Sequence, residues 1–316
     1  MSGAISTTSY SSGLIPLYIT QFSTNLELLL QQKGSMLRGK VREGMHMGKM
    51  ASPINQIGTL ALKAPAGRFA PLPNQQAVVQ RRWVFPQEGE LPQLIDTFDE
   101  LQTIVDPKSG LVETAANAVG RAWDDNLILN ATGTANLGQD ANSLTTETFS
   151  TSLYQIAATF GNGSTACGLT VSKMIECKRI FRHNHNDLET DQPTMVIGSQ
   201  QESDLLNQVQ FVSTEFNDRP VLVDGQVKRF MGFDIVVMER LPQTTVNTTR
   251  GVLAFVKSGL YLGVWKDLTN NIDIRTDLSG RPWQILTQTM YGSTRTQPGK
   301  VIQILCADTS GADINP

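Results

Sequence analysis

Residues 107–133, PKSGLVETAANAVGRAWDDNLILNATG, decide the fold class of this 316-residue chain. Their apolar side chains recur every three or four residues, which is the spacing of one helix face: Val112, Ala116, Val119, Trp123 and Leu127. Ser109 is a suitable N-terminal cap, and Gly133 closes the segment. Twenty residues of helix span about 30 Å. We therefore predict one long helix that acts as a spine.

The sequence after residue 145 predicts alternating helices and strands. Helices are expected at 149–160, from Ser172 past Ile180, and after a capping box formed by Ser199 and Glu202. Strands are expected at 194–197, 233–238, 252–256, 260–265, 283–291 and 301–305, with alternation at 272–274 and a turn at 298–299. This pattern indicates an α+β fold.

The sequence before residue 83 has a different character. Residues 1–13 are mostly Ser, Thr and Gly, which predicts a flexible tail. A short helix is expected next, because Phe22, Leu26, Leu29 and Lys33 share one helix face. Alone it would be marginal in water, so its apolar face needs a surface to lie on.

Residues 39–82 predict a long two-stranded excursion. Its β-capable pieces lie at 57–62 and 77–79, with a loose tip near 65–73. A two-stranded hairpin is barely stable by itself, and its open edges can pair with another chain. The excursion therefore suggests assembly, and a disordered loop is the alternative.

Charge is distributed unevenly along the chain. Of 26 basic and 29 acidic residues, nine basic and two acidic ones lie in residues 1–82, which leaves 17 and 27 for the remainder. A basic segment of this kind could lie against an acidic surface of another copy, or face nucleic acid. A solvated basic arm without a partner is the third reading.

Several classes of protein are disfavoured by composition. The three cysteines, Cys167, Cys177 and Cys306, form no CxxC pair, so neither a disulfide framework nor a zinc site is indicated. No signal-peptide pattern is present, and no apolar stretch approaches the roughly 18 residues of a membrane span. We expect a soluble protein made in a reducing cytoplasm, with no membrane partner.

No motif supports catalysis or a cofactor. There is no GxSxG elbow and no GxGxxG loop. His183 and His185 could share a strand face and bind a metal, but their Asn- and Asp-rich surroundings favour a solvated loop. Arg121, Asp124 and Asp125 could form an ion pair within the helix or meet a neighbouring subunit, and both readings stay open. We predict no catalytic residue, no metal and no cofactor.

The order of these segments resembles the major capsid proteins of tailed bacteriophages, which have the Hong Kong 97-type fold. The resemblance is carried by RRWVFP (81–86), LIDTFDELQTIVDPKSGLVETAANAVGRAWDDNLIL (94–129), TVSKMIECKRIF (170–181), PTMVIGSQQESDLLNQVQFVS (193–213), FMGFDIVVMERLP (230–242), LAFVKSGLYLGVWKDLTNNIDIRTDL (253–278) and QTMYGSTRTQPGKVIQI (288–304). Together these segments cover most of the chain.

The resemblance implies a domain organisation. It assigns an N-terminal arm to residues 1–38, an extended E-loop to 39–84, a P-domain with the spine helix to 85–149 and 266–309, an A-domain to 150–265 and a C-terminal tail to 310–316. No charged coiled-coil segment precedes the arm, so a separate scaffolding protein is expected. Lys49 and Lys63 match cross-linking lysines by position only, and we predict no cross-link.

The implied function is structural, without enzymatic activity. Copies would assemble in the host cytoplasm as pentamers and hexamers of an icosahedral virion capsid, with a portal, around double-stranded DNA that is contacted without sequence preference. An encapsulin-like compartment shell is the first alternative. A soluble hydrolase using His183 or His185 is the second.

The residues expected at contacts between subunits fall into three groups. The apolar members are Phe22, Leu26, Leu29 and Phe69; the basic ones are Arg38, Lys49, Arg68, Arg81 and Arg82; the acidic ones are Asp96, Asp99, Glu100, Asp106 and Glu113. Charge complementarity would set the register, and burial of apolar groups would supply the affinity. We expect the first eighty or so residues of an isolated copy to be structurally incomplete.

Overall fold

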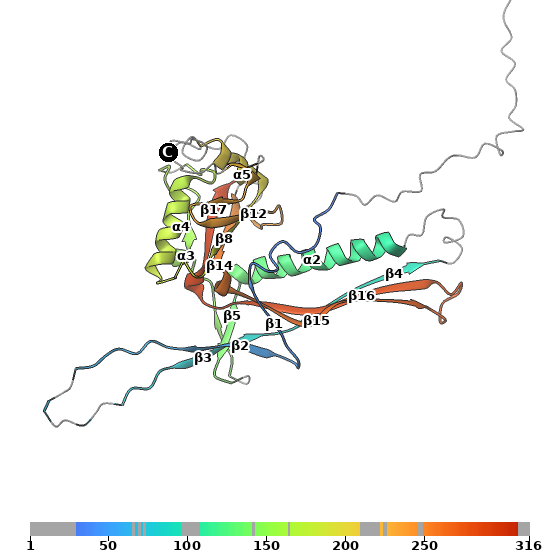
Figure 1. Ribbon diagram of the computed structural model, residues 1–316, viewed down its shortest axis with the longest axis horizontal. Coiled ribbons are helices and arrows are strands. Elements are labelled where there is room, and N and C mark those ends of the chain that lie inside the picture. Colours follow the sequence, from blue (N-terminus) through green and yellow to red (C-terminus); the bar gives the residue numbers. More distant parts are fainter. Residues whose placement is uncertain are drawn as a thin grey trace, which may run out of the picture.

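The computed structural model describes residues 30–64, 67–68, 71, 74–96, 108–140, 143–163, 165–208, 222–223, 226–245 and 249–308. Figure 1 shows three parts: an elongated unit, a compact unit at one end of it, and a hairpin that projects from the junction.

The elongated unit is a long helix on a four-stranded sheet. The helix, α2, spans Lys108–Thr132, and its 25 residues confirm the predicted spine. The sheet has the order β1-β15-β16-β4, with bounds Arg42–Met45, Leu260–Ile274, Trp283–Arg295 and Gln87–Ile95. Strand β1 is parallel to β15 and the other pairs are antiparallel. Trp123 of α2 packs edge-on against Tyr291 of β16, with ring centroids 6.4 Å apart.

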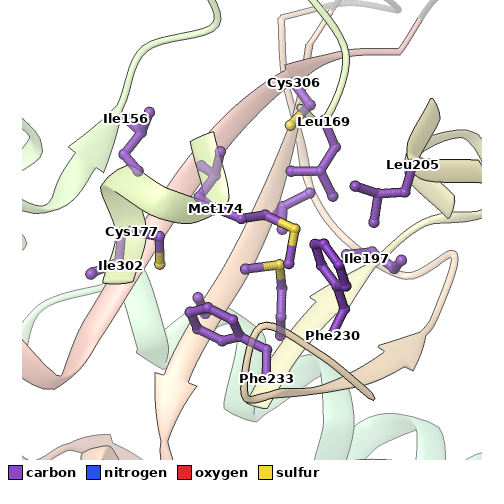
Figure 2. Packing of buried hydrophobic residues seen from close by; sticks show 14 of the residues in the cluster. Ile156, Leu169, Met174, Cys177, Ile197, Leu205, Phe230, Phe233, Ile302 and Cys306 are labelled. Atoms are coloured by element: carbon purple, nitrogen blue, oxygen red, sulfur yellow. The ribbon is translucent and has the colours of Figure 1, made fainter. Parts of the chain in front are cut away.

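The compact unit is a seven-stranded sheet with helices on one face. The sheet order is β11-β12-β8-β14-β17-β7, with bounds Arg229–Phe230, Phe233–Val237, Pro193–Ile197, Thr249–Val256, Val301–Ala307 and Gln155–Ile156, and β13 (Gln243–Thr245) pairs with β14. The helices are α3 (Thr151–Tyr154), α4 (Val171–His183) and α5 (Ser199–Leu206). Figure 2 shows the core on this face, where Met174 and Cys177 of α4 and Leu205 of α5 meet Ile197, Phe233 and Ile302.

A second core joins the two units. It combines α2 (Leu127, Ile128, Ala131), the other face of the large sheet (Val196, Leu253, Phe255, Val301), the loop after β12 (Met238, Leu241), the start of β15 (Leu260, Leu262, Val264), and Leu37 and Val41 from the N-terminal region. Short 3-10 turns at Lys257–Gly259 and Pro298–Lys300 carry the chain between the units. The compact and elongated units therefore share buried side chains.

The projecting hairpin comprises residues 51–84. Its strands β2 (Ala51–Ile57) and β3 (Val79–Val84) pair antiparallel, and at the base β3 also pairs with β5 (Ala135–Gly138), which pairs with β6 (Thr145–Glu147). Strand β5 begins three residues after α2 ends, so the helix leads directly into the sheet that carries the hairpin (Figure 1). A further short pair joins β9 (Leu222–Val223) and β10 (Gln226–Val227).

Several local predictions need correction. The helix predicted over 149–160 is only the single turn α3, because Gln155 and Ile156 pair with Gln303 and Ile304 at the edge of the sheet. Sheet pairing here overrides helical periodicity. Ser109 lies inside α2 and is therefore not its cap.

Helices α4 and α5 begin slightly earlier than the sequence predicts. The cap of α5 is Gly198 and not Ser199, and its N–H donates to Gln201 Oε1 at 3.2 Å. Only this half of the expected capping box forms, because glycine has no side chain to accept a bond from the helix. Helix α4 starts at Val171 behind Thr170, whose hydroxyl accepts from the N–H of Lys173 at 3.3 Å.

The N-terminal predictions are tested only in part. Phe22, Leu26 and Leu29 lie outside the described residues, and residues 30–37 form no helix. In the hairpin, the strand ends at Ile57, where the β-capable piece 57–62 was expected to begin. Among the described residues, no helix is both long and apolar enough to cross a membrane.

Candidate inter-subunit interface

The projecting hairpin exposes apolar side chains that its own chain does not cover. Ile57, Leu60, Leu62 and Val78 are 73%, 61%, 103% and 62% exposed. The N–H of Gly58 donates to the carbonyl of Val78 at 2.8 Å, which continues the β2–β3 pairing by one step. No strand is assigned beyond it in residues 59–64 and 74–78. This part of the hairpin has the character of a surface that another molecule covers.

The hairpin and its flanks carry positive charge without a single acid. Residues 44–87 contain five basic residues and no Asp or Glu. Lys49, Arg68 and Arg81 are exposed, which suits the predicted contact with an acidic surface. Arg82 is a correction: it is 3% exposed, and its Nη1 donates to Glu147 Oε2 of the same chain at 2.5 Å. The Arg82 guanidinium has no face left for a neighbouring copy.

The other predicted contact residues divide into described and undescribed positions. Asp96 and Glu113 are exposed on the elongated unit. Phe22, Leu26, Leu29, Phe69, Asp99, Glu100 and Asp106 lie outside the described residues. Contacts of these acids with another copy stay predictions.

An arm segment, residues 31–41, docks on α2 of its own chain. The fully buried carboxylate of Asp124 accepts from Gln32 Nε2 (2.6 Å), Ser35 Oγ (2.5 Å), Met36 N (2.9 Å) and Leu37 N (3.2 Å). One turn earlier, Gly120 allows the backbone to cross: a Cβ there would lie 2.4 Å from the carbonyl carbon of Gly34. The expectation that the whole N-terminal region is incomplete alone is therefore wrong for this segment.

The three charged residues of α2, Arg121, Asp124 and Asp125, bind other parts of the same chain, which neither interpretation of the sequence proposed. Arg121 Nη1 donates to Gln31 Oε1 at 2.9 Å and to the carbonyl of Gln32 at 3.2 Å. Asp125 pairs with Arg240 of the compact unit. These contacts hold the arm segment and the compact unit to α2, in place of the intrahelical ion pair that was one of the two open readings. Gly120 in the helix interior was the one sequence signal of a close approach.

Arg38 joins the arm segment to the elongated unit. Its guanidinium donates to Asp267 at 3.3 and 3.2 Å and to Glu43 at 3.3 Å, and it lies 4.6 Å from the Trp123 ring centroid. Hydrogen bonding to Arg38 lowers the pKa of Asp267 below its ordinary value. Arg38 is thus engaged within its own chain, and a contact with another copy stays a prediction.

A pocket lies beside His183, the residue that the hydrolase alternative would use. A cavity of about 570 Å³ between α3 and α4 is lined by His183, Glu176 and Arg179, among others. The Arg179 guanidinium donates to Glu176 at 2.7 and 2.6 Å and holds the pKa of that carboxyl below its ordinary value. Within the described residues, no hydrogen bond joins His183 to a carboxylate, and no group of three His, Cys, Asp or Glu side chains is placed to hold a metal.

The fold of this chain is similar to that of chains in solved phage and GTA capsid structures. The capsid structure of cyanophage P-SCSP1u superposes with a TM-score of 0.72 at 16% identity, over 94% of this chain and 95% of that one. The capsid of cyanophage Pam1 gives 0.70 at 12% identity, over 95% and 99%. The capsid of a native GTA particle gives 0.67 at 14% identity, over 96% and 100%. These likenesses establish the predicted Hong Kong 97-type fold.

The sequence places the chain in a family as well as a fold. Residues 14–308 match the model of the phage capsid protein family, so the chain belongs to that family. No curated protein matches the sequence. The chain is a shell-forming structural subunit of a virion capsid and not an enzyme, and the encapsulin alternative is not favoured.

Proposed function

We propose that copies of this chain assemble in the host cytoplasm into a closed icosahedral shell of pentamers and hexamers that encloses double-stranded DNA. In this proposal the projecting hairpin of each copy docks on a neighbouring copy. One observation carries it: the hairpin extends away from both units, with an exposed apolar row and no acidic residue in 44–87.

Apolar burial would supply the affinity of this contact. Fully burying a Leu or Ile side chain contributes about 1.5–3 kcal/mol, and Ile57, Leu60 and Leu62 are all largely exposed. Each contact is modest, but closed symmetry repeats it in every subunit.

Charge would set the register of the hairpin on its neighbour. Lys49, Arg68 and Arg81 would face the acidic stretch of sequence that contains Asp96, Asp99, Glu100, Asp106 and Glu113. Complementary charges steer encounter and disfavour wrong registers more than they add affinity. We place Arg38 only at the rim of this contact between copies, because Asp267 and Glu43 of its own chain already bind its guanidinium.

The domain assignment fits the proposal with two adjusted boundaries. We propose an arm at 1–38, an E-loop at 39–84, a P-domain at 85–149 and 266–309, an A-domain at 150–265 and a tail at 310–316. Strand pairing favours moving β17 into the A-domain, because β17 pairs with β14 and β7. It favours giving all of β15 to the P-domain sheet, because β15 pairs with β1 and β16.

The remaining partners follow from the same proposal. A separate scaffolding protein and a portal would direct assembly, and basic groups on the inner surface would bind DNA phosphates without sequence preference. Binding of duplex fragments to opened shells should then weaken steeply as salt rises and should not depend on base sequence.

A shortened hairpin tests the docking contact. Replacing residues 59–77 by Asn-Gly joins Gly58 to Val78 by a two-residue turn at the point where their backbones are already hydrogen-bonded. This change spares β2 and β3, whose residues Ala51 and Val84 are buried. We expect a folded chain with unchanged thermal unfolding that sediments as small species, whereas the intact chain sediments as shells.

A milder pair of variants separates apolar docking from hairpin length. Leu60→Ser with Leu62→Ser should lower the yield of shells, and Asn74→Ser with Gln76→Ser, on exposed polar positions of the same loop, should not. Shells of normal yield and shape from the 59–77 replacement, seen by negative-stain electron microscopy, would refute the proposal.

A further inference from the structure

Three charged side chains meet where the projecting hairpin leaves the body of the molecule. Arg82 belongs to β3 of the hairpin, Glu147 to β6, and Arg295 to the end of β16. Arg82 and Arg295 are 3% and 0% exposed. We call this group the arginine hub.

Arg295 holds the end of α2 to the hairpin sheet. Its Nη1 donates to the carbonyls of Ala131 and Gly133, both at 2.9 Å, and these are carbonyls that a helix terminus leaves without partners. Its Nη2 donates to the backbone carbonyl of Glu147 at 3.3 Å. One buried guanidinium therefore bonds both the helix end and β6.

Arg82 completes the link from β6 to the hairpin. Its Nη1 donates to Glu147 Oε2 at 2.5 Å, across the sheet from β3 to β6. The order of contacts is then α2, Arg295, Glu147, Arg82 and the hairpin. This side-chain path runs beside the covalent one, in which β5 leaves α2 and pairs with β3.

The hub contains more positive than negative charge. Two buried guanidinium groups lie near one carboxylate, which accepts a hydrogen bond from Arg82 while Arg295 bonds only the backbone carbonyl of Glu147. Neither Arg82 Nε nor Arg295 Nε has a hydrogen-bond partner among the described residues. Burial lowers the pKa of Arg295, with Glu147 opposing the shift and Arg82 adding to it. A buried charge that is only partly paired is costly in energy and is a poor source of stability.

We infer that the arginine hub positions the projecting hairpin: it fixes the angle between the hairpin and α2, so that the hairpin reaches a neighbouring copy in one orientation. The inference rests on the proposed function, in which the hairpin docks on another copy. Arg82, Glu147 and Arg295 are positioning residues here, since they act through the hairpin and touch no neighbour themselves. A contact that must recur with identical geometry in every subunit needs such a fixed angle.

The adjacent arginine provides a matched control. Arg81 and Arg82 are neighbours on β3 with opposite side-chain directions, one exposed and one buried. Arg81→Gln and Arg82→Gln make the same chemical change and remove the same charge. Only Arg82→Gln breaks the hub, and it leaves the Glu147 carboxylate to balance Arg295.

The measurement is a distance within one chain, made on the unassembled species after shells have been removed by sedimentation. The three native cysteines are buried, so spin labels can be attached selectively at Lys63→Cys on the hairpin and Glu113→Cys on α2, both exposed positions. Labelled chain is diluted with unlabelled chain, and the distance distribution is recorded by pulsed electron paramagnetic resonance. We expect a single narrow distribution for the otherwise unchanged chain and for Arg81→Gln, and a broad one for Arg82→Gln.

A conservative variant keeps the test decisive if Arg82→Gln does not fold. Arg82→Lys retains the charge but loses the planar fork of donors, so its distribution should be broader than that of the parent and narrower than that of Arg82→Gln. Equal widths for Arg82→Lys and the parent, together with no broadening in any folded Arg82→Gln, would overturn the inference. Failure of the docking proposal would instead appear as normal shells from the 59–77 replacement, whatever the distances are.

Discussion

Asp124 illustrates how one residue decides the course of the N-terminal region. Its carboxylate is fully buried on α2 and accepts four hydrogen bonds from residues 32–37. An ionised carboxylate can accept bonds at both oxygens, whereas an amide presents two N–H donors on one side. The sequence showed Asp124 only as a helical charge beside Arg121, since its partners lie about 90 residues away.

The first prediction concerns this carboxylate. Asp124→Asn turns an NH₂ group toward donors of the arm segment, and leaving buried donors unpaired costs about 1–3 kcal/mol each. We expect a fall of a few kcal/mol in the free energy of unfolding, measured by urea titration. Asp125→Asn is the control, because Asp125 pairs with Arg240 at the surface and such pairs contribute about 0–1 kcal/mol. Equal losses in the two variants would contradict the assigned role.

His46 gives the second prediction, a dependence of stability on pH. Its Nε2 lies 2.6 Å from Tyr261 Oη, its ring packs on Trp265, and burial lowers its pKa. The folded chain thus favours neutral imidazole, so unfolding takes up a proton below the unfolded value of about 6.5. The contribution of neutral His46 to stability is complete above that pH, and it is lost as the pH falls toward the lower pKa of the folded chain. The melting temperature of His46→Gln should decline less between pH 7 and 5, and identical pH profiles would exclude this effect.

At the scale of elements, regular apolar periodicity located helices and strands correctly. It failed where a segment pairs with a strand far away in the sequence. The spine helix and the central strands β8, β12, β14 and β17 appear where apolar spacing placed them. Strands β8, β14 and β17 each bury a nearly continuous run of residues. The segment 149–160 has helical spacing, yet Gln155 and Ile156 complete a sheet edge against a strand about 150 residues later. Pairing between strands so far apart in the sequence depends on the tertiary structure, so the local sequence of 149–160 does not reveal it.

The outline of the candidate interface could be predicted, because it follows from the composition of the sequence. A basic, proline- and glycine-rich excursion without acids is a property of composition, and the structure places it outside the body of the molecule. The arginine hub was not predictable, because Arg82, Glu147 and Arg295 come from three distant strands and only one of them stood out as a member of a basic cluster. Arg82 was accordingly assigned to the surface, where its neighbour Arg81 lies.

The contact between the arm segment and α2 gives the third prediction. Gly→Ala inside a helix ordinarily stabilises by about 1 kcal/mol. At Gly120 the added Cβ would lie 2.4 Å from the carbonyl carbon of Gly34 and 2.6 Å from the nitrogen of Ser35, so the arm segment must move. We expect Gly120→Ala to lower the melting temperature and to make the arm segment sensitive to protease. Ala118→Gly, the reverse exchange two residues away, should cost about 1 kcal/mol and leave protease resistance of the arm segment unchanged.

At the scale of the whole molecule, two units that look separate share one core. Leu37 and Val41 of the arm segment, the second half of α2, the large sheet and the start of β15 are buried together. Inter-domain interfaces that are small and polar permit relative motion, while a large apolar one does not. The compact and elongated units should therefore unfold together as one cooperative body.

The chain carries its own probes for this last prediction. Its four tryptophans, Trp83, Trp123, Trp265 and Trp283, lie in the hairpin and the elongated unit, whereas its three cysteines are buried in the compact unit. Tryptophan fluorescence and thiol reactivity thus follow different parts of the molecule in one urea titration. Coincident midpoints are expected, because a shared core makes the transition cooperative. Val41→Ala should lower both midpoints equally, since its side chain lies in that core. Thiols that react at a urea concentration where tryptophan fluorescence is still native would show that the compact unit opens alone, and the shared core would then not couple the two units.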